Sequence, residues 1–583
     1  MGEEKSKSFG SFADLARSLG VDPDEGQDEG AGSRSQWDSA LDGLRSGTRE
    51  VIESAGESFG PMETGPDCYR DPGSEEMELL ASFRIRTVFP DALKEEVAAL
   101  PQDPSGSDFE GRVDLRGQRI FTVDGEDAKD YDDAIQITSL EDGSTEIGVH
   151  IADVGHYVVP GTALDNEALT RGTSVYLPDQ VIPMLPEGLS NHLCSLVPDR
   201  DRLAFSVYMT FDAEGKRREC RVHKSVIRSM FRCTYRIVQK LLDAVDDEET
   251  QRLKPIAADL KLFEQWTKRQ QLLRDQAGSL RMQSSERKFA FDDKHEVERI
   301  YPSEIYFSQT LIEETALAAN QAVGDYFRER DLPTIYRIHP RKDQEEIDAV
   351  TEMLGKQGIR VPDKDRLTGR DVGRLIREAR RRPNAEALIG RIMGLVERAS
   401  YEVAKGDDGA EHWGLAREHY LHFTSPIRRY PDLIVHRWLH DVSSRAKEAE
   451  SELLDPQQIA ELCDVAGHCS VQSDLSGMVE NALDDLKICQ YMDRFRGDVI
   501  KAVIQRVSPA GIEIYLREHH VTGFIPARTL DGRKKVEGSR LTVSSRKGSR
   551  VFDEGSAIEI RVQDIDFVRL QVILEVADRA GRK

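Results

Sequence analysis

The chain has 583 residues, 39% of them hydrophobic and 32% charged, with a formal net charge of −25. A chain of this length is too long for one hydrophobic core. It has no apolar run that approaches the roughly 18 residues needed to span a membrane. The N-terminus lacks the apolar core of a secretory signal, and seven scattered cysteines without a CxxC pair argue against a disulfide framework and favour the cytoplasm.

The charge is unevenly distributed along the chain. Residues 1–110 carry 25 acidic and 10 basic side chains, whereas residues 494–583 carry 12 acidic and 18 basic ones. Affinity for a phosphate backbone depends on local cationic surface rather than on the total charge. The C-terminal region is therefore a candidate RNA-binding domain in spite of the acidic total.

The order of elements predicts an α+β protein with a disordered N-terminal segment. Residues 1–75 are acidic, rich in Gly and Ser and poor in β-branched residues, so they are predicted to be a disordered leader. Residues 76–110 form a linker, and residues 111–493 have the strand and helix patterns of a mixed α+β domain. Strands are expected at 147–154, 158–159 and 203–211, and helices at 235–245, 256–274, 308–329, 384–403, 432–449 and 455–493.

The last region has a different pattern. Five short strand-like runs in residues 494–578 are separated by Gly, Pro and charged turns, which is typical of a small closed barrel of the OB type. The basic stretch Arg533–Arg550 is expected to be a loop of this barrel. Residues 579–583 would be a short tail.

An acidic segment near the start of the α+β domain is the first candidate site. Asp124, Asp130, Asp132 and Asp133 lie in a loop between the apolar runs IFTV and AIQI. Carboxylates this close repel one another unless cations lie among them, and Mg²⁺ prefers such oxygen ligands. Two ions about 4 Å apart are suited to phosphodiester cleavage. Taken alone, the segment leaves two interpretations open, a catalytic metal site and a solvated or structural acidic loop.

A second segment, HFTSPIRRYPDLIVHRWL, begins at His422. It places Thr424, Ser425, Arg428 and Arg429 on a turn that opens a helix, where backbone amides, hydroxyls and guanidinium groups together suit a phosphate. An ordinary capped helix with surface arginines is the alternative. That alternative accounts for the Ser-Pro but not for the double arginine followed by Tyr430.

Together the two segments resemble the ribonuclease II/ribonuclease R family, whose catalytic RNB domain carries both motifs. The acidic motif D-x5-D-x-D-D is matched at Asp124, Asp130, Asp132 and Asp133, and F-T-S-P-I-R-R-Y is matched from Phe423 to Tyr430. The stretches GVHIADV, SVYLPDQVIPMLPEGLSNHLCSL and LIEETALAAN are similar as well. The resemblance covers about residues 78 to 577 and includes the C-terminal barrel, which is similar to the S-one type of OB fold.

The resemblance implies a processive, hydrolytic 3′-to-5′ exoribonuclease that acts on single-stranded RNA, releases nucleoside 5′-monophosphates and serves RNA turnover and processing. It implies that the four aspartates hold Mg²⁺, which Mn²⁺ is a candidate to replace, with Asp132 the most sensitive to substitution. Arg428 would contact the scissile phosphate and stabilise the charge that develops there.

Further residues are expected to bind RNA on the same grounds. Tyr176 would stack on a base near the 3′ end, although a half-buried strand tyrosine is the alternative, and Tyr235 would clamp the last nucleotide. One of Glu313 and Glu314 would approach the terminal ribose; adjacent helix positions point about 100° apart, so only one can face the site. Thr424, Ser425 and Arg429 complete the set as groups that position the phosphate.

The N-terminus departs from the family pattern. Family members commonly carry two cold-shock OB domains before the catalytic domain, and both are expected to be missing here. The acidic leader would then be free to compete with RNA for basic surface, or to dock a protein partner. We expect the rest of the chain to act as a monomeric catalytic unit.

Two other classes of function remain open from the sequence. One is an RNA-binding regulator that kept the fold and lost turnover, which the complete aspartate set and Arg428 argue against. The other is a metal-dependent endonuclease or an enzyme that acts on DNA. End-labelled RNA and DNA oligonucleotides would separate these classes.

Overall fold

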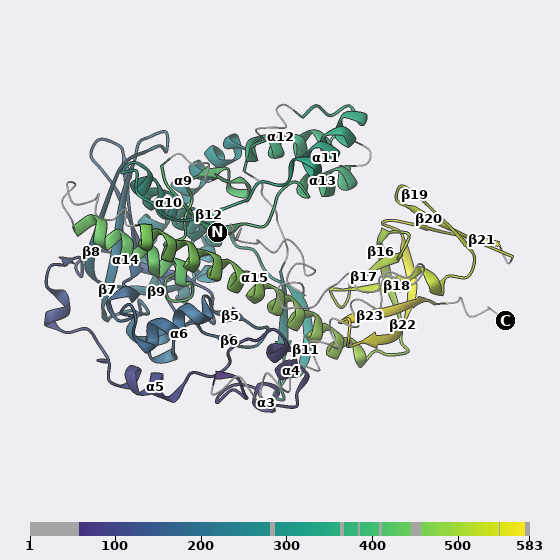
Figure 1. Ribbon diagram of the computed structural model, residues 1–583, viewed down its shortest axis with the longest axis horizontal. Helices are drawn as coiled ribbons and strands as arrows, with labels where there is room; N and C mark the ends of the chain where they lie inside the picture. The colour runs from purple at the N-terminus through teal and green to yellow at the C-terminus, as the bar shows by residue number, and fades with distance from the viewer. Residues whose placement is uncertain are drawn as a thin grey trace.

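The larger part of the chain is organised around one seven-stranded sheet (Figure 1). The computed structural model describes residues 58–279, 286–361, 367–382, 385–406, 411–444, 456–546 and 548–577. In spatial order the strands are β1 (Val113–Asp114), β8 (Arg217–Arg228), β7 (Asp201–Phe211), β4 (Thr145–Ala152), β3 (Asp133–Ser139), β2 (Phe121–Asp124) and β9 (Phe231–Thr234). Neighbours run antiparallel except for the outer pairs β1–β8 and β2–β9, which are parallel.

Helices cover both faces of this sheet, and each face has its own apolar core. One core joins the sheet to α7 (Tyr235–Leu242), α9 (Ala257–Ala277), α10 (Phe307–Arg328) and α14 (Tyr430–Ser444). The other joins it to α6 (Ala163–Arg171), the π-helical turn Gly188–Leu193 and the long helix α15 (Pro456–Asp493). The strand β7, which lies inside the sheet between β8 and β4, is consequently buried along nearly its whole length. Within the described part of the chain, no helix combines the length and the apolar character that a membrane span requires.

Smaller elements surround the sheet. Three helices form a separate bundle with its own core, namely α11 (Gln344–Lys356), α12 (Gly369–Ala379) and α13 (Ala385–Met393). Two-stranded ladders pair β5 (Val175–Tyr176) with β6 (Val181–Ile182), β10 (Arg287–Phe291) with β11 (Val297–Pro302), β12 (Thr334–Ile338) with β13 (Ser400–Ala404), and β14 (Glu411–His412) with β15 (Arg417–Glu418).

One predicted helix is wrong over its second half. The sequence pattern predicts a single helix over residues 384–403, whereas α13 ends at Met393 and residues 400–404 form β13. Its partner β12 is far away in the sequence, and the Tyr401 side chain is buried in the core of the sheet. Long-range pairing of Tyr401 and Val403, residue types that favour strands, therefore outweighs the local helical pattern.

The predicted boundary of the disordered leader is also wrong. Residues 1–57 lie outside the described residues, but 58–75 are folded, although the sequence placed them in the leader. This region includes α3 (Asp67–Arg70), and α4 (Glu75–Ser82) and α5 (Asp91–Ala98) follow it. Tyr69 is fully buried and donates a hydrogen bond to Asp179 (2.7 Å). A few apolar anchors thus suffice to order a segment whose average composition is polar.

A buried ion pair fastens this N-terminal region to α15. Lys487 Nζ lies 2.7 Å from Glu76 Oε1, and the two side chains are only 2% and 5% exposed. We expect Lys487→Met to lower the free energy of unfolding by about 3–5 kcal/mol, because it leaves a buried carboxylate without its cation. Urea unfolding of the full chain measures this change. The double variant Glu76→Gln/Lys487→Met should recover much of the loss; a double variant as unstable as the single one would contradict the explanation.

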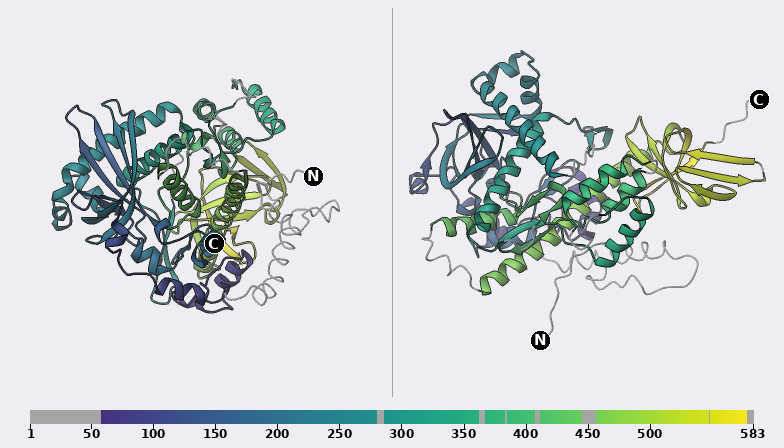
Figure 2. Two further views of the ribbon diagram at one scale, coloured as in Figure 1. Left: turned by 60° about the vertical axis from the view of Figure 1, so that its left-hand side comes forward. Right: turned by 90° about the horizontal axis from the view of Figure 1, so that it is seen from above.

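The C-terminal region forms the predicted five-stranded barrel. Its strands are β16 (Val499–Val507), β17 (Gly511–Leu516), β18 (Val521–Pro526), β23 (Gln571–Val576) and β22 (Ala557–Asp566), in the closed order β16-β17-β18-β23-β22. The end of α15 shares the core of the barrel through Ile488, Cys489 and Met492. This helix therefore links the barrel to the larger domain (Figure 2).

The basic stretch inserted between β18 and β22 is a sheet rather than the loop predicted from the sequence. It consists of β19 (Arg533–Glu537), β20 (Arg540–Ser545) and β21 (Gly548–Asp553), which pair antiparallel in that order. Leu541, Val543 and Phe552 are buried and belong to the core of the barrel. Apolar residues at alternating positions of β20 thus give the inserted sheet one face that packs on the barrel. The high charge of the stretch makes this alternation difficult to recognise in the sequence.

Candidate active site

The aspartate loop lies at one end of the sheet, between β2 and β3. Asp124 is the last residue of β2 and Asp133 the first of β3, and the two strands are antiparallel neighbours, which brings both ends of the loop together. On the other side β9 runs parallel to β2, with Thr234 opposite Asp124. Thr234 then caps α7 by accepting a hydrogen bond from the Ile237 amide (3.3 Å), so that Tyr235 begins this helix at the same end of the sheet.

Asp132 joins the two motifs, which lie about half the chain apart. Its Oδ1 accepts a hydrogen bond from the Ile427 amide (2.8 Å), and its Oδ2 lies 3.7 Å from Nε of Arg428. The Asp132 side chain is 5% exposed, whereas that of Arg428 is 40% exposed. The arginine therefore spans from the buried carboxylate toward solvent, where a phosphate can reach it.

The aspartates are held where their charged forms are poorly stabilised by the protein alone. Burial raises the pKa of Asp132 well above its usual value; burial and then the Asp133 carboxylate raise the pKa of Asp124 to about 8. Burial also raises the pKa of Asp133 to about 6 and that of Asp130 above its usual range. Oδ2 of Asp124 and Oδ2 of Asp132 have no hydrogen-bond donor among the described residues. Each of these observations indicates a place where a cation would stabilise ionised carboxylates.

The donor set fits a hard divalent cation. It consists of carboxylate oxygens, two of them without a hydrogen-bond donor among the described residues, which are ligands that Mg²⁺ prefers. In the described ranges, no three His, Cys, Asp or Glu side chains are gathered into a complete metal cage. An ion held here would therefore need water or substrate phosphate among its ligands, as Mg²⁺ commonly has.

The two arginines of the second motif have different partners. Arg429 forms two hydrogen bonds to Asp432 (3.0 and 2.7 Å), and Asp432 also accepts a hydrogen bond from the Ser425 amide (2.8 Å). Arg428 instead donates to Ser425 Oγ (3.1 Å) and faces Asp132. Thr424 and Ser425 are buried. The turn is thus built on the Arg429–Asp432 pair, and Arg428 is the arginine presented to the site.

The predicted RNA-binding tyrosines both lie close to the aspartates. The Tyr176 hydroxyl is 3.5 Å from Asp130 Oδ2, at the long limit for a hydrogen bond, and the residue is 40% exposed. The backbone amide of Tyr176 donates to Glu480 on α15 (2.8 Å). Tyr235 is partly buried, and burial followed by Asp133 and Asp124 raises its pKa. Tyr176 is thus a partly exposed strand residue, as the alternative interpretation expected, and it also lies beside the aspartates.

Glu313 and Glu314 have different environments on α10. Both pair with Nη2 of Arg274, at 2.9 and 2.7 Å, but the Glu314 side chain is fully buried and that of Glu313 is 52% exposed. The adjacent positions therefore point in different directions, as the helix geometry predicts. Glu313 is the one that is accessible from solvent.

Two groups that support the aspartate loop were not found from the sequence. Ser195 accepts a hydrogen bond from the Tyr131 amide (2.9 Å) and donates to the carbonyl of Lys129 (2.8 Å). Arg232, on β9, donates from Nη2 to the carbonyls of Gly125 (2.7 Å) and Glu126 (2.6 Å). The only sequence signal for Arg232 is its position in the strand that precedes Tyr235. A serine in a loop gives no such signal.

Arg232 is expected to set the metal requirement. Hydrogen bonds from a charged group contribute about 1.5–3 kcal/mol each, so Arg232→Ala should loosen the loop and raise the half-saturating Mg²⁺ concentration roughly tenfold. Hydrolysis rates across a Mg²⁺ titration measure this. Arg236→Ala is the matched control. Arg236 also contacts the aspartate loop, but it binds the exposed Glu126 carboxylate (2.6 Å) and not the loop backbone. Equal shifts in both variants would contradict the role assigned to Arg232.

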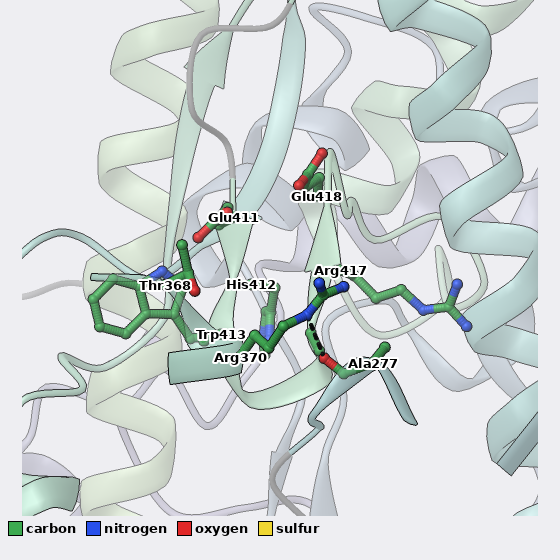
Figure 3. A pocket seen from close by; sticks show the side chains of 10 residues that line it. Ala277, Thr368, Arg370, Glu411, His412, Trp413, Arg417 and Glu418 are labelled. Atoms are coloured by element: carbon green, nitrogen blue, oxygen red, sulfur yellow. Dashed lines mark hydrogen bonds between the residues drawn. The ribbon is translucent and has the colours of Figure 1, made fainter. Parts of the chain in front are cut away.

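A separate cavity of about 210 Å³ lies between the start of α12, the end of α9 and the β14–β15 hairpin (Figure 3). Its lining includes Glu411, Glu418 and Arg370, and Arg370 donates to the carbonyl of Ala277 (3.3 Å). None of the four aspartates lines it. His412 in its wall contacts Tyr420, which in turn contacts His422 at the start of the second motif. The cavity is thus connected to the second motif through these ring contacts, while the aspartates lie outside its lining.

Comparison with known proteins agrees with this geometry. The RNB domain model matches residues 112–445, and the S1 RNA binding domain model matches residues 493–577. Ribonuclease R of Thermotoga maritima is 34% identical over 492 residues, which cover 83% of this chain and 67% of that protein. Ribonuclease R of Escherichia coli is 32% identical over 86% of this chain, but the chain spans only 62% of its length.

A solved structure shares the fold. Mycoplasma genitalium RNase R in complex with ribose methylated single-stranded RNA superposes with a TM-score of 0.73 and is 26% identical, covering 87% of this chain and 78% of that one. The RNB model alone matches more than half of the chain, and it includes both the aspartate loop and the second motif. The chain therefore belongs to the RNB family of exoribonucleases, with ribonuclease R proteins among its relatives.

Proposed function

We propose that the chain degrades single-stranded RNA processively from the 3′ end to nucleoside 5′-monophosphates, with Mg²⁺ as its metal. The observation that carries this proposal is the contact of buried Asp132 with both Ile427 and Arg428. It unites the acidic motif and the arginine motif in one site. The complex of the Mycoplasma genitalium relative with single-stranded RNA supports RNA as the ligand.

Each site residue has a role in this proposal. Asp124, Asp130, Asp132 and Asp133 would hold two Mg²⁺ ions, which supply activation of the attacking water and neutralisation of the leaving oxygen. Arg428 binds the scissile phosphate. Its separation from Asp132 (3.7 Å) is too long for a tight ion pair, so the guanidinium keeps donors for a phosphate.

The remaining residues hold the RNA in place. Tyr176 offers an exposed ring for a terminal base. Tyr235, which lies close enough to Asp133 and Asp124 for their charges to raise its pKa, would clamp the last nucleotide. Glu313 is the acidic residue on α10 with access to ribose hydroxyls, while Glu314 is buried against Arg274. Ser425 and Arg429 shape the turn that presents Arg428, and Thr424, which precedes them in the sequence, is buried.

End-labelled substrates test this function. RNA and DNA of one sequence, labelled at the 3′ or 5′ end, are incubated with Mg²⁺ or with EDTA. We expect mononucleotide release from 3′-labelled RNA at the first time points, a 5′-labelled strand that shortens gradually, no cleavage of DNA, and no reaction in EDTA. Internal fragments would indicate an endonuclease, and tight binding without cleavage would indicate an RNA-binding regulator.

A trap experiment tests processivity. With excess unlabelled RNA added after the reaction starts, a processive enzyme completes the strands to which it is already bound.

All seven cysteines lie within the described residues and are free thiols. This is consistent with a reducing compartment, and we propose that the chain acts there as a monomer.

A further inference from the structure

The projecting sheet formed by β19, β20 and β21 lies on the side of the barrel that faces away from the larger domain (Figures 1 and 2). Residues 533–553 contain seven basic and two acidic residues, in a chain whose formal net charge is −25. The sheet therefore carries a net positive charge, whereas the rest of the chain is net negative. The aspartates belong to the larger domain, so the sheet projects away from the part of the molecule that holds them (Figures 1 and 2).

The register of the strands divides the sheet into an inner and an outer end. At the inner end the two carboxylates are neutralised, because Arg540 pairs with Asp553 (2.6 Å) and Lys535 with Glu537 (2.7 Å). The next row, Val536–Leu541–Phe552, attaches the sheet to the barrel core, and the buried side chain of Val543, two positions further along β20, extends this attachment. The inner end is therefore electrically balanced and structural.

The strand rows at the outer end have cations and hydroxyl groups but no carboxylate; the nearest acidic residue in the sequence is exposed Asp531, two positions before Arg533. Arg533, Ser544 and Ser549 form one cross-strand row, and the two serine hydroxyls lie 3.0 Å apart. Lys534 occupies the next row, and Arg546 lies in the turn that closes β20 and β21; all of these residues are exposed. No Asp or Glu occurs from 538 to 552. Guanidinium, ammonium and hydroxyl groups are the side chains that contact phosphate oxygens in nucleic-acid complexes.

The outer end has no exposed aromatic side chain on which a base could stack. The only aromatic residue among 533–553 is Phe552, which is buried in the core of the barrel. Base stacking is the usual source of affinity for single strands that does not depend on salt. A strand held here is consequently bound through its backbone, without sequence preference and with strong salt dependence.

We propose that the outer end of the projecting sheet is a phosphate-binding surface for the 5′ part of an RNA whose 3′ end occupies the active site. This rests on the proposed function, which fixes the direction of the strand. Because the sheet lies beyond the barrel, only an RNA long enough to pass the barrel engages both places. The surface thus makes affinity depend on RNA length while leaving the chemistry unchanged.

Two charge-matched double variants test this surface. Arg533→Gln/Arg546→Gln removes two outer cations, and Lys535→Gln/Arg540→Gln removes two inner ones, so both change the net charge equally. Affinity is measured for the full chain carrying Asp132→Asn, so that RNA is bound but not cut. The RNAs share their 3′ sequence and have about 6 or about 30 nucleotides, the longer one exceeding the usual 4–16 nucleotides of one OB fold.

The expected result is a difference between RNA lengths. The outer variant should bind the long RNA roughly tenfold more weakly at low salt, and the slope of log K against log salt should fall by about 0.7 for each phosphate that is no longer neutralised. The short RNA and the inner variant should be unaffected. Unchanged binding of the long RNA, an equal loss for both lengths, or an equal loss in the inner variant would each overturn the proposal.

A second measurement separates this proposal from the proposed function. With Asp132 intact, the outer variant should hydrolyse the short RNA at the unaltered rate. If the unsubstituted chain releases no mononucleotides, the proposed function fails, and the length-dependent binding is still measurable by itself. If hydrolysis proceeds but the outer variant shows no length effect, only the role of the sheet is rejected.

Discussion

Asp132→Asn is expected to reduce RNA hydrolysis by about 10³-fold or more while RNA binding stays close to normal. The amide can still accept the hydrogen bond from Ile427 through its oxygen, so the link between the two motifs survives. The substitution removes the negative charge that a cation needs and that faces Arg428 (3.7 Å). Single-turnover rates and affinity for the same RNA separate the two effects. Loss of binding in parallel with the rate would indicate a disturbed fold instead.

The same substitution should stabilise the metal-free protein at neutral pH. Asp132, Asp124 and Asp133 all have a raised pKa in the folded state, for Asp124 about 8 and for Asp133 about 6. A carboxyl with a raised folded pKa favours folding fully below its unfolded pKa of about 4, and this contribution is lost as the pH rises toward the folded value. In EDTA the Tm should therefore fall between about pH 4 and pH 8.

Asp132→Asn removes one of these groups, so its Tm in EDTA should fall less steeply over that pH range than the Tm of the unsubstituted chain. Addition of Mg²⁺ should raise the Tm of the unsubstituted chain more than that of the variant, because a bound cation stabilises the ionised carboxylates. Melting curves with and without Mg²⁺ across this range test both statements. Identical pH profiles for the two proteins would refute the electrostatic explanation.

Arg428→Ala is the second substitution with a large expected effect, a fall in rate of about 10²–10³-fold with an unchanged fold. The Arg428 side chain is 40% exposed and lies 3.7 Å from Asp132, so it forms no tight ion pair on which the fold depends. Its charge is directed at the place where a phosphate would lie. Arg428→Lys should recover only part of the rate, because an ammonium group cannot reproduce the two-pronged geometry of a guanidinium.

The adjacent arginine provides the control. Arg429→Ala removes the partner of Asp432, which is fully buried, and should lower the free energy of unfolding by about 3–5 kcal/mol. Two neighbouring arginines of one motif thus have opposite expected phenotypes, one in the rate and the other in stability. Rates measured below the melting temperature of each variant, together with urea unfolding, distinguish them. A stability loss in Arg428→Ala as large as that in Arg429→Ala would contradict this division.

The sequence predicts well those features that depend on local pattern. The aspartate loop between two strands and the five-stranded barrel both follow from alternation and turn residues, and the structure confirms them. The partner of Arg429 is local, because Asp432 lies three residues further on at the start of α14. The partner of Arg428 could not be predicted, because Asp132 lies in the first motif and only the tertiary fold brings the two side chains together. The same holds for Glu313 and Glu314, whose exposure depends on where Arg274 of α9 lies.

Other errors have the same origin in long-range contacts. The strand at 400–404 exists because β12 pairs with it, and residues 58–75 are folded because Tyr69 and Asp179 meet across more than a hundred residues. Ser195 supports the aspartate loop only because its own loop packs on Tyr131. Composition and periodicity describe a segment's own tendencies and contain no record of such partners.

The helix α15 has a mechanical consequence. It has 38 residues and so a length of about 57 Å, with the barrel packed on its last turns. Glu480, in the same helix, holds the backbone of Tyr176, whose ring stands beside Asp130. A stiff helix fixed at both places transmits force along its axis. Under the proposed function, in which the barrel binds the strand and Tyr176 stacks on the terminal base, tension on the RNA would therefore reach that base. Pulling on the 5′ end of the strand in an optical trap should therefore change the step rate, and not merely the time for which the strand stays attached.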